Sequence, residues 1–243
     1  MSVSVRYGGR FGNHLFQYVC GRLFAARNGL RLDSLFTHLE MVRMAPQDFG
    51  TVVDSGPEII LGNGDDVLGR AWTKARYVLD GHFQNSEWYH KARAEIDSFA
   101  FPEPVPDVNM KDIVVNIRCG DDYRRLGWVI HPSWYLDVLG RENFERLHIV
   151  TDNPDPRYLS HFRKFDPVVV SSGAAGDWRY LRSFDRIVCS NSSFCWWAAF
   201  FSRAGRIYTF KRWVGEGPSG LPIVRLGRFP NGVEVDGPLM GEA

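Results

Sequence analysis

The sequence predicts an α/β protein of two domains, and three observations support this. Short apolar runs typical of strands alternate with segments of helical spacing in both halves of the chain. Residues 101–106 contain three prolines, a composition typical of a stiff, extended linker. The length of 243 residues suits two small domains better than one large one. We therefore expect domains at residues 1–106 and 107–243.

The N-terminal half begins with the pattern of an open α/β domain. Val3–Tyr7 is a β-branched and aromatic run that predicts a strand, and the glycine-rich segment 8–13 ends it. Residues 14–28 carry apolar side chains at helical spacing, and Gly29 follows as a C-terminal cap. Further elements are expected as strands at 30–32, 58–61 and 77–79 and as a helix at 86–99.

The C-terminal half continues this alternation. Ile113–Ile117 is an apolar run with one polar residue, typical of a buried parallel strand. Further strands are expected at 147–150, 168–170, 186–189 and 207–210, and helices at 132–139, 177–184 and 194–202. Glycine and proline are frequent in the last thirty or so residues, which we expect to be only partly ordered against the body of the protein.

The composition excludes several classes of function. Lys and Arg number 29 against 28 Asp and Glu, which removes the usual electrostatic argument for nucleic acid or an anionic membrane as the main partner. No apolar run reaches the roughly 18 residues of a membrane span, and the first residues lack the apolar region of a signal peptide. We expect a cytoplasmic protein with no transmembrane segment, for which peripheral membrane association stays open.

The spacing of the four cysteines suits neither a zinc site nor a disulfide framework. Cys20, Cys119, Cys189 and Cys195 lie among apolar or motif-like residues, which is typical of reduced thiols inside a cell. We expect neither a bound metal nor a bound cofactor.

The glycine-rich turn at 8–13 stands where open α/β folds bind ligands, beyond the end of a strand. Such a turn allows a ligand to approach the backbone, and the helix that follows favours anions at its start. Asp33 lies about 20 residues further on, where a dinucleotide fold places its ribose-binding acid. A dinucleotide oxidoreductase is therefore an alternative, as is a tight turn with no ligand.

Arg118 ends the apolar strand at 113–117, where an unpaired charge is costly. Either Asp121 or Asp122 supplies its anionic partner in a structural salt bridge, or the diphosphate of a ligand does. Position alone does not decide between these. Asp155 follows the strand at 147–150, and we expect it to form an Asx turn rather than a metal site.

Three hydroxyls and an amide stand at 190–193, between the strand at 186–189 and an apolar helix. One such residue is enough for an ordinary N-cap, so four in a row exceed what capping requires. The excess suits hydroxyl and backbone N–H donors that point at phosphate oxygens. Trp196 and Trp197 in the following helix are expected to be core residues.

In order, these motifs resemble those of the α-1,2-fucosyltransferase family, glycosyltransferase family 11, from residue 9 to about 213. The first and last motifs are the most specific. The resembling segments are Gly9–Asn13 with Phe16–Tyr18, Gly81–Asn85 with Trp88 and Tyr89, Asn116–Tyr123 (family pattern H-x-R-R-G-D-Y), Thr151–Asp152, and Ser190–Ala198, in which Cys195 replaces a serine.

The resemblance implies a GT-B fold, in which two Rossmann-like domains face a central cleft. The N-terminal domain would lie on the acceptor side, and the C-terminal domain would bind the nucleotide sugar. It implies inverting, metal-independent transfer of a sugar, usually fucose from GDP-fucose, to a hydroxyl of a glycan acceptor. Arg118 and Asp121 are expected to be catalytic, with Arg118 on the donor diphosphate. The expected substrate-binding residues are Arg10, Asn13, His14, Asn116, Asp152, Ser192, Ser193 and Phe194.

The chain departs from the family pattern at several positions. Asn116 replaces a histidine, Cys119 the second arginine, and His14 the usual glutamine. Asp122 is an additional aspartate. These changes leave the phosphate-binding pattern mostly intact, but they leave open another nucleotide sugar or a non-catalytic relative that binds a nucleotide sugar or a glycan. Asp121, Asp122 and His14 are the candidates for the catalytic base, which the motifs do not assign.

Overall fold

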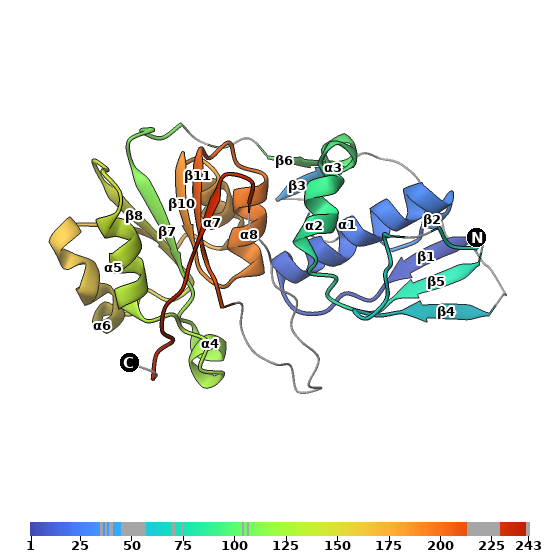
Figure 1. Ribbon diagram of the computed structural model, residues 1–243, viewed down its shortest axis with the longest axis horizontal. Helices are drawn as coiled ribbons and strands as arrows, with labels where there is room; N and C mark the ends of the chain where they lie inside the picture. The colour runs from blue at the N-terminus through green and yellow to red at the C-terminus, as the bar shows by residue number, and fades with distance from the viewer. Residues whose placement is uncertain are drawn as a thin grey trace. The chain divides into compact units, whose positions relative to one another are not determined.

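Both halves of the chain fold as α/β units, which confirms the predicted α/β class. The structure is a computed structural model (Figure 1) that describes residues 1–34, 36, 38, 41–44, 57–69, 71–73, 75–103, 105, 107–212 and 229–241. The chain divides into two compact units, Met1–Glu103 and Pro104–Ala243. The predicted boundary followed residue 106, and Pro104 and Pro106 of the predicted linker lie outside the described residues.

The first unit is built on a four-stranded parallel sheet in the order β2-β1-β5-β4. Its elements in chain order are β1 (Ser2–Val5), α1 (Phe11–Asn28), β2 (Arg31–Leu32), β3 (Val42–Met44), β4 (Glu58–Leu61), β5 (Arg76–Leu79), α2 (Ser86–Lys91), α3 (Arg93–Phe99) and β6 (Ala100–Pro102). β3 and β6 form a separate antiparallel pair. α1 packs against β1, β2 and α3, and Gly29 ends it at φ 61°, as predicted.

The second unit is built on six parallel strands in the order β12-β11-β10-β7-β8-β9. Its elements in chain order are β7 (Ile113–Ile117), α4 (Asp121–Arg125), α5 (Pro132–Gly140), β8 (Leu147–Thr151), α6 (Pro156–Leu159), the 3-10 helix η1 (Ser160–Phe165), β9 (Val168–Val170), α7 (Ala174–Leu181), β10 (Arg186–Cys189), α8 (Ser193–Phe200), β11 (Arg206–Phe210) and β12 (Gly232–Val235). Counted from β7, this is the Rossmann-like order 3-2-1-4-5-6. The strand order reverses between β7 and β10, whose carboxyl ends therefore form the topological switch point.

The pleat of β7 sends alternate side chains to opposite faces of the sheet. Ile113, Val115 and Ile117 join an apolar core with aromatic side chains of α5 and of segment 156–165. Asn116 has the opposite parity and lies on the other face. Figure 1 shows α5 and α6 on one side of these strands and α7 and α8 on the other. The strand ends are thus positioned by helices packed on both faces.

The structure differs from the sequence prediction in several segments. The prediction did not include β3, α4, α6 or η1, and α7 begins and ends three residues earlier than the helix expected at 177–184. Residues 100–102 form β6 rather than part of a linker, because a short antiparallel edge tolerates Pro102 at its end. The helix predicted at 86–99 is two helices that meet at Ala92. β12 stands in the glycine-rich C-terminal region, where parallel pairing with β11 supplies the order that the local composition does not indicate.

The four cysteines are buried free thiols, as expected. The two tryptophans of α8 are core residues, also as expected, with Trp196 1% and Trp197 0% exposed. Among the helices that the structure describes, none is both long enough and apolar enough to cross a membrane.

Candidate functional site

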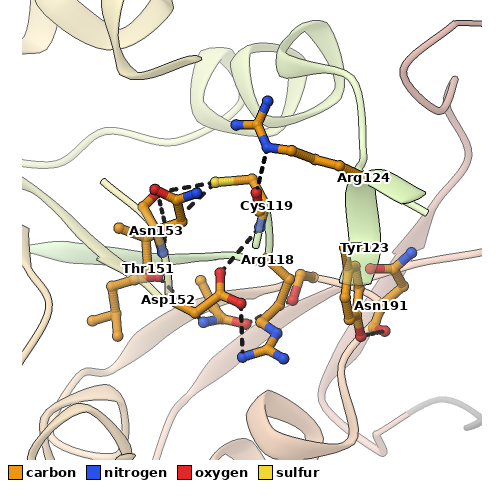
Figure 2. Close-up of polar contacts among 11 residues, drawn as sticks. Arg118, Cys119, Tyr123, Arg124, Thr151, Asp152, Asn153 and Asn191 are labelled. Carbon is orange, nitrogen blue, oxygen red and sulfur yellow. Dashed lines mark hydrogen bonds and ion pairs between the residues drawn. The ribbon is translucent and has the colours of Figure 1, made fainter. Parts of the chain in front are cut away.

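Arg118 and Asp152 are the first residues after β7 and β8, two neighbouring parallel strands (Figure 2). Nη1 of Arg118 lies 3.1 Å from Oδ2 of Asp152, and the two side chains are 17% and 20% exposed. Asp152 is therefore the protein's own anionic partner for Arg118. The expectation that Asp121 or Asp122 forms this salt bridge is wrong, because Asp121 is exposed at the first position of α4 and Asp122 pairs with Arg125.

Asp152 is held at both of its carboxylate oxygens. Its Oδ1 accepts the backbone N–H of Cys119 at 3.1 Å, while its Oδ2 pairs with Arg118. Gly120 leaves the space that this carboxylate occupies, because a Cβ atom there would lie 2.7 Å from Oδ2. Asp152 therefore orients Arg118, while its contact with substrate stays a prediction.

Tyr123 of α4 connects Arg118 to the turn at 190–193. The guanidinium carbon of Arg118 lies 5.1 Å from the centre of the Tyr123 ring, within the range of a cation–π contact. The Tyr123 hydroxyl donates to the backbone carbonyl of Asn191 at 3.0 Å. Burial raises the pKa of Tyr123, and the nearby Arg118 and Ser192 offset this only in part, so the phenol remains a protonated donor.

Asn191 is tied to the segment after α4 as well. Its Nδ2 donates to the carbonyl of Trp128 at 2.9 Å, and the rings of Tyr123 and Trp128 meet edge to face with their centres 5.9 Å apart. Its Oδ1 is buried and finds no hydrogen-bond partner in the described parts of the chain. The ends of β7 and β10 are therefore fixed to each other through α4 and the residues that follow it.

Asn116 joins three strand ends from inside the sheet. Ser190 Oγ donates to Asn116 Oδ1 at 2.6 Å, and Asn116 Nδ2 donates to the carbonyl of Val150 at 3.2 Å. The Asn116 residue is 2% exposed. This burial argues against the direct substrate contact that the motif implied, and it makes Asn116 a residue that holds β7, β8 and β10 in register.

α8 begins directly after this turn, with Ser192 at its N-cap and Ser193 as its first residue. Ser192 is buried, and its backbone N–H donates to the Ser190 carbonyl at 2.8 Å. Ser193 and Phe194 are only partly buried. The first turn of a helix favours anions through its N–H groups and its dipole. The N-terminus of α8 therefore lies at the switch point. It is next to Asn191, which bonds Tyr123 of α4, and Tyr123 in turn contacts Arg118.

Arg124 anchors α4 on the side away from Asn191. Its Nε donates to the Cys119 carbonyl at 2.7 Å, and its Nη2 pairs with Asp155 at 2.5 Å. Asp155 also accepts the backbone N–H of Arg157 at 2.8 Å, which confirms its predicted turn-forming role. The Cys119 thiol is buried and donates to the Asn153 carbonyl at 3.1 Å.

In the first unit, the two glycine-containing motifs meet beyond the ends of β1 and β5. Asn13 Oδ1 accepts from Gln84 Nε2 at 2.9 Å. Gln17 joins the same turns, because its Nε2 donates to the Gly81 carbonyl at 2.9 Å and its Oε1 accepts the Gly8 N–H at 3.1 Å. The resembling segments 9–18 and 81–85 are thus joined by neutral hydrogen bonds. Gln17 was in the motif but had no predicted role.

Asn63, which the sequence analysis did not single out, fixes the turn at 81–85. Its Oδ1 accepts the backbone N–H groups of His82 and Phe83 at 2.7 and 2.9 Å. Phe83 has a φ of 50°, and its carbonyl accepts the Tyr89 hydroxyl at 2.5 Å. Left-handed backbone at a bulky residue persists only where its surroundings over-determine it, as they do in many functional sites.

Two other predicted residues of the first unit stand at the start of α1. Arg10 is its exposed N-cap, with an extended backbone. Nδ1 of His14 lies 3.1 Å from Nε2 of His38. Burial and then the proximity of His38 lower the pKa of His14, so its imidazole is neutral at pH 7. Asp33 follows β2 directly, as a ribose-binding acid would.

No protein-family model matches the chain, and no curated protein sequence matches it. Within the described ranges, no group of three or more His, Cys, Asp and Glu side chains is placed to hold a metal ion.

Proposed function

We propose that the protein is an inverting, metal-independent glycosyltransferase of GT-B type. It moves a sugar, fucose from GDP-fucose in the first instance, to a hydroxyl of a glycan acceptor. One observation supports this above all: Arg118 and the turn that starts α8 are connected through Tyr123 at the switch point of a doubly wound sheet. Ligands of such sheets bind at this point, and both a guanidinium and a helix N-terminus suit phosphate oxygens.

The proposed step breaks the bond between the sugar C1 and the diphosphate oxygen. The acceptor oxygen forms a new bond to C1 from the opposite face, the electron pair of the broken bond stays on GDP, and the acceptor proton passes to a base. Arg118 and the first turn of α8 stabilise the charge that develops on GDP. A charge-assisted hydrogen bond of this kind is worth roughly 1.5–3 kcal/mol. Asp121, Asp122 and His14 remain the candidates for the base.

The first unit would bind the acceptor. Its strand-end residues Asn13, Gln84 and His14 are amides and an imidazole, which suit the hydroxyls of a saccharide better than a diphosphate. Arg10 beside them is exposed. Four free thiols support a reducing location such as the cytoplasm.

A binding panel tests the donor part of the proposal. The melting temperature should rise with GDP-fucose and GDP and stay unchanged with UDP-glucose, a CMP-sugar or NAD(P), because only ligands of the folded state stabilise it. Arg118→Ala should weaken GDP binding by about tenfold to a hundredfold. Arg6→Ala is the matched control, since Arg6 also follows a parallel strand and pairs with an aspartate, Asp80. Equal GDP affinity of the two variants would contradict the proposed site.

Transfer is tested by mass spectrometry of an acceptor panel incubated with GDP-fucose. A glycosylated product that Arg118→Ala fails to form, while retaining the parent's circular dichroism, is the expected result. The non-catalytic alternative, favoured by the burial of Cys119 where the family has an arginine, predicts GDP binding with no product. The oxidoreductase alternative, favoured by Asp33 directly after β2, predicts NAD(P) binding and no GDP binding.

A further inference from the structure

We infer that Tyr123 is a positioning residue of the donor site, which fixes Arg118 relative to the first turn of α8 so that both reach one diphosphate. This inference rests on the proposed function. It assigns a task to a side chain that neither donates to phosphate in the proposed step nor takes a proton. Its basis is the set of contacts that Tyr123 makes in two directions.

The first direction is toward Arg118, whose guanidinium has two fixed neighbours. Asp152 holds Nη1 at 3.1 Å, and the Tyr123 ring lies 5.1 Å from the guanidinium carbon. Nε of Arg118 is buried and has no hydrogen-bond partner among the described residues. The carboxylate fixes one end of the planar group, so the ring is the contact that defines the tilt of the plane. A diphosphate needs that tilt, because two parallel N–H groups must point at its oxygens.

The second direction is toward the turn that precedes α8. The Tyr123 hydroxyl donates to the Asn191 carbonyl at 3.0 Å, one residue before the N-cap of the helix. The ring also meets Trp128, whose carbonyl accepts from Asn191 Nδ2. One rigid side chain therefore spans from the guanidinium to the start of α8. In this proposal, the Tyr123 side chain sets the distance between the Arg118 guanidinium and the start of α8.

The two substitutions remove different parts of the side chain. Tyr123→Phe removes the hydroxyl, which bonds Asn191 and also interacts with Arg118 and Ser192, and keeps the ring beside Arg118, whereas Tyr123→Leu removes the ring as well. α4 keeps its other anchor in both variants, because Arg124 bonds Cys119 and Asp155 independently of Tyr123. Tyr180→Phe is the matched control: this partly buried tyrosine of the same unit also uses its hydroxyl in a hydrogen bond, at 2.8 Å to His148 Nδ1.

The affinity for GDP is measured by calorimetry, and the donor KM, the acceptor KM and kcat by product formation. Tyr123→Phe should weaken GDP binding by about fivefold, because the hydroxyl's bond to Asn191 and its interactions with Arg118 and Ser192 are lost. Tyr123→Leu should weaken it by more than about tenfold, since the cation–π contact is lost as well. The donor KM should rise in parallel and the acceptor KM should not change. Tyr180→Phe should bind GDP as the parent does. A general loss of folded protein would instead lower kcat at unchanged donor KM.

A double variant shows whether Tyr123 acts through Arg118. In the Arg118→Ala background, Tyr123→Leu should cost little further GDP affinity, because residues that work as one unit are not additive. Additive losses, or a Tyr123→Leu protein that binds GDP as tightly as the parent, would overturn the inference while leaving the proposed function intact. A parent protein that binds no nucleoside diphosphate would overturn both. If Tyr123→Leu does not fold, the comparison of Tyr123→Phe with Tyr180→Phe decides.

Discussion

Two ion pairs stand at the ends of neighbouring parallel strands, one pair in each unit, and they differ in their surroundings. Arg6 and Asp80 directly follow β1 and β5, which are parallel neighbours, just as Arg118 and Asp152 directly follow β7 and β8. The N–O distances are 2.9 and 3.1 Å. The side chains of the first pair are 54% and 50% exposed, whereas those of the second are 17% and 20% exposed.

The surroundings of a strand end, rather than the charges placed there, distinguish a candidate site from ordinary surface. Water and salt screen a half-exposed pair, which contributes little to stability. Arg118 is covered by an aromatic ring, and its partner Asp152 accepts a backbone N–H as well. In the first unit, neutral hydrogen bonds of Asn13, Gln17 and Asn63 hold the strand ends together instead.

The largest effect on stability is expected from removing Asp152, the acidic partner of Arg118. Asp152→Ala leaves Arg118 without its carboxylate and the Cys119 N–H without its acceptor, so we expect a loss of about 2–3 kcal/mol in the free energy of unfolding. Asp80→Ala, in the strand-end ion pair of the first unit, should cost less than about 0.5 kcal/mol. Urea denaturation of the two variants measures both values. Equal costs would remove the distinction drawn between the two pairs.

A smaller loss of stability is expected in the first unit, where the Asn63 side-chain amide, rather than an ion pair, holds the turn at 81–85. Asn63→Ala removes the acceptor of two backbone N–H groups in the turn that holds Phe83 at positive φ, and it should cost about 1–2 kcal/mol. Asn85→Ala removes the acceptor of one, the Glu87 N–H at the start of α2, and it should cost about 1 kcal/mol. In urea denaturation, Asn63→Ala should lose more free energy of unfolding than Asp80→Ala. The reverse order would mean that the exposed ion pair supports this edge.

The smallest effect concerns pH. The folded-state pKa of His14 lies below its ordinary value of 6.5, because burial and His38 disfavour the charged ring. As the pH falls below 6.5, the unfolded chain takes up a proton that the folded chain resists, so stability is lost toward the folded-state pKa. His14→Gln removes this dependence. The stability of the parent relative to the variant should therefore fall between pH 7 and pH 5, and a constant difference would contradict the assignment.

Local periodicity was enough to predict β7, β10 and α8 of the candidate site, but not α4, which carries Tyr123. The strand at 113–117 and the position of Arg118 at its end follow from one apolar run, and the turn at 190–193 follows from four polar residues before an apolar helix. The capping glycine Gly29 and the strand at 186–189 are local signals of the same kind. Each depends on residues within about one or two turns of chain, so neighbours in sequence specify it.

The partners across the sheet could not be predicted in this way. The sequence places Asp121 and Asp122 nearest to Arg118, but both begin α4, where helix geometry rather than proximity in sequence directs their side chains. Pairing with Asp152 depends on the order of β7 and β8, which is a property of the whole sheet. The bridge made by Tyr123 depends in turn on where α4 packs.

Gly120 sets a spatial limit on this arrangement. Its φ of −64° is accessible to any amino acid, so its backbone conformation does not require glycine. A methyl group on its α-carbon would stand 2.7 Å from the Asp152 carboxylate, inside the volume that the acid needs. A side chain at position 120 would therefore require the Asp152 carboxylate to shift away from the place where it pairs with Arg118, so the lack of one carbon atom after β7 preserves the geometry of an ion pair with the neighbouring strand.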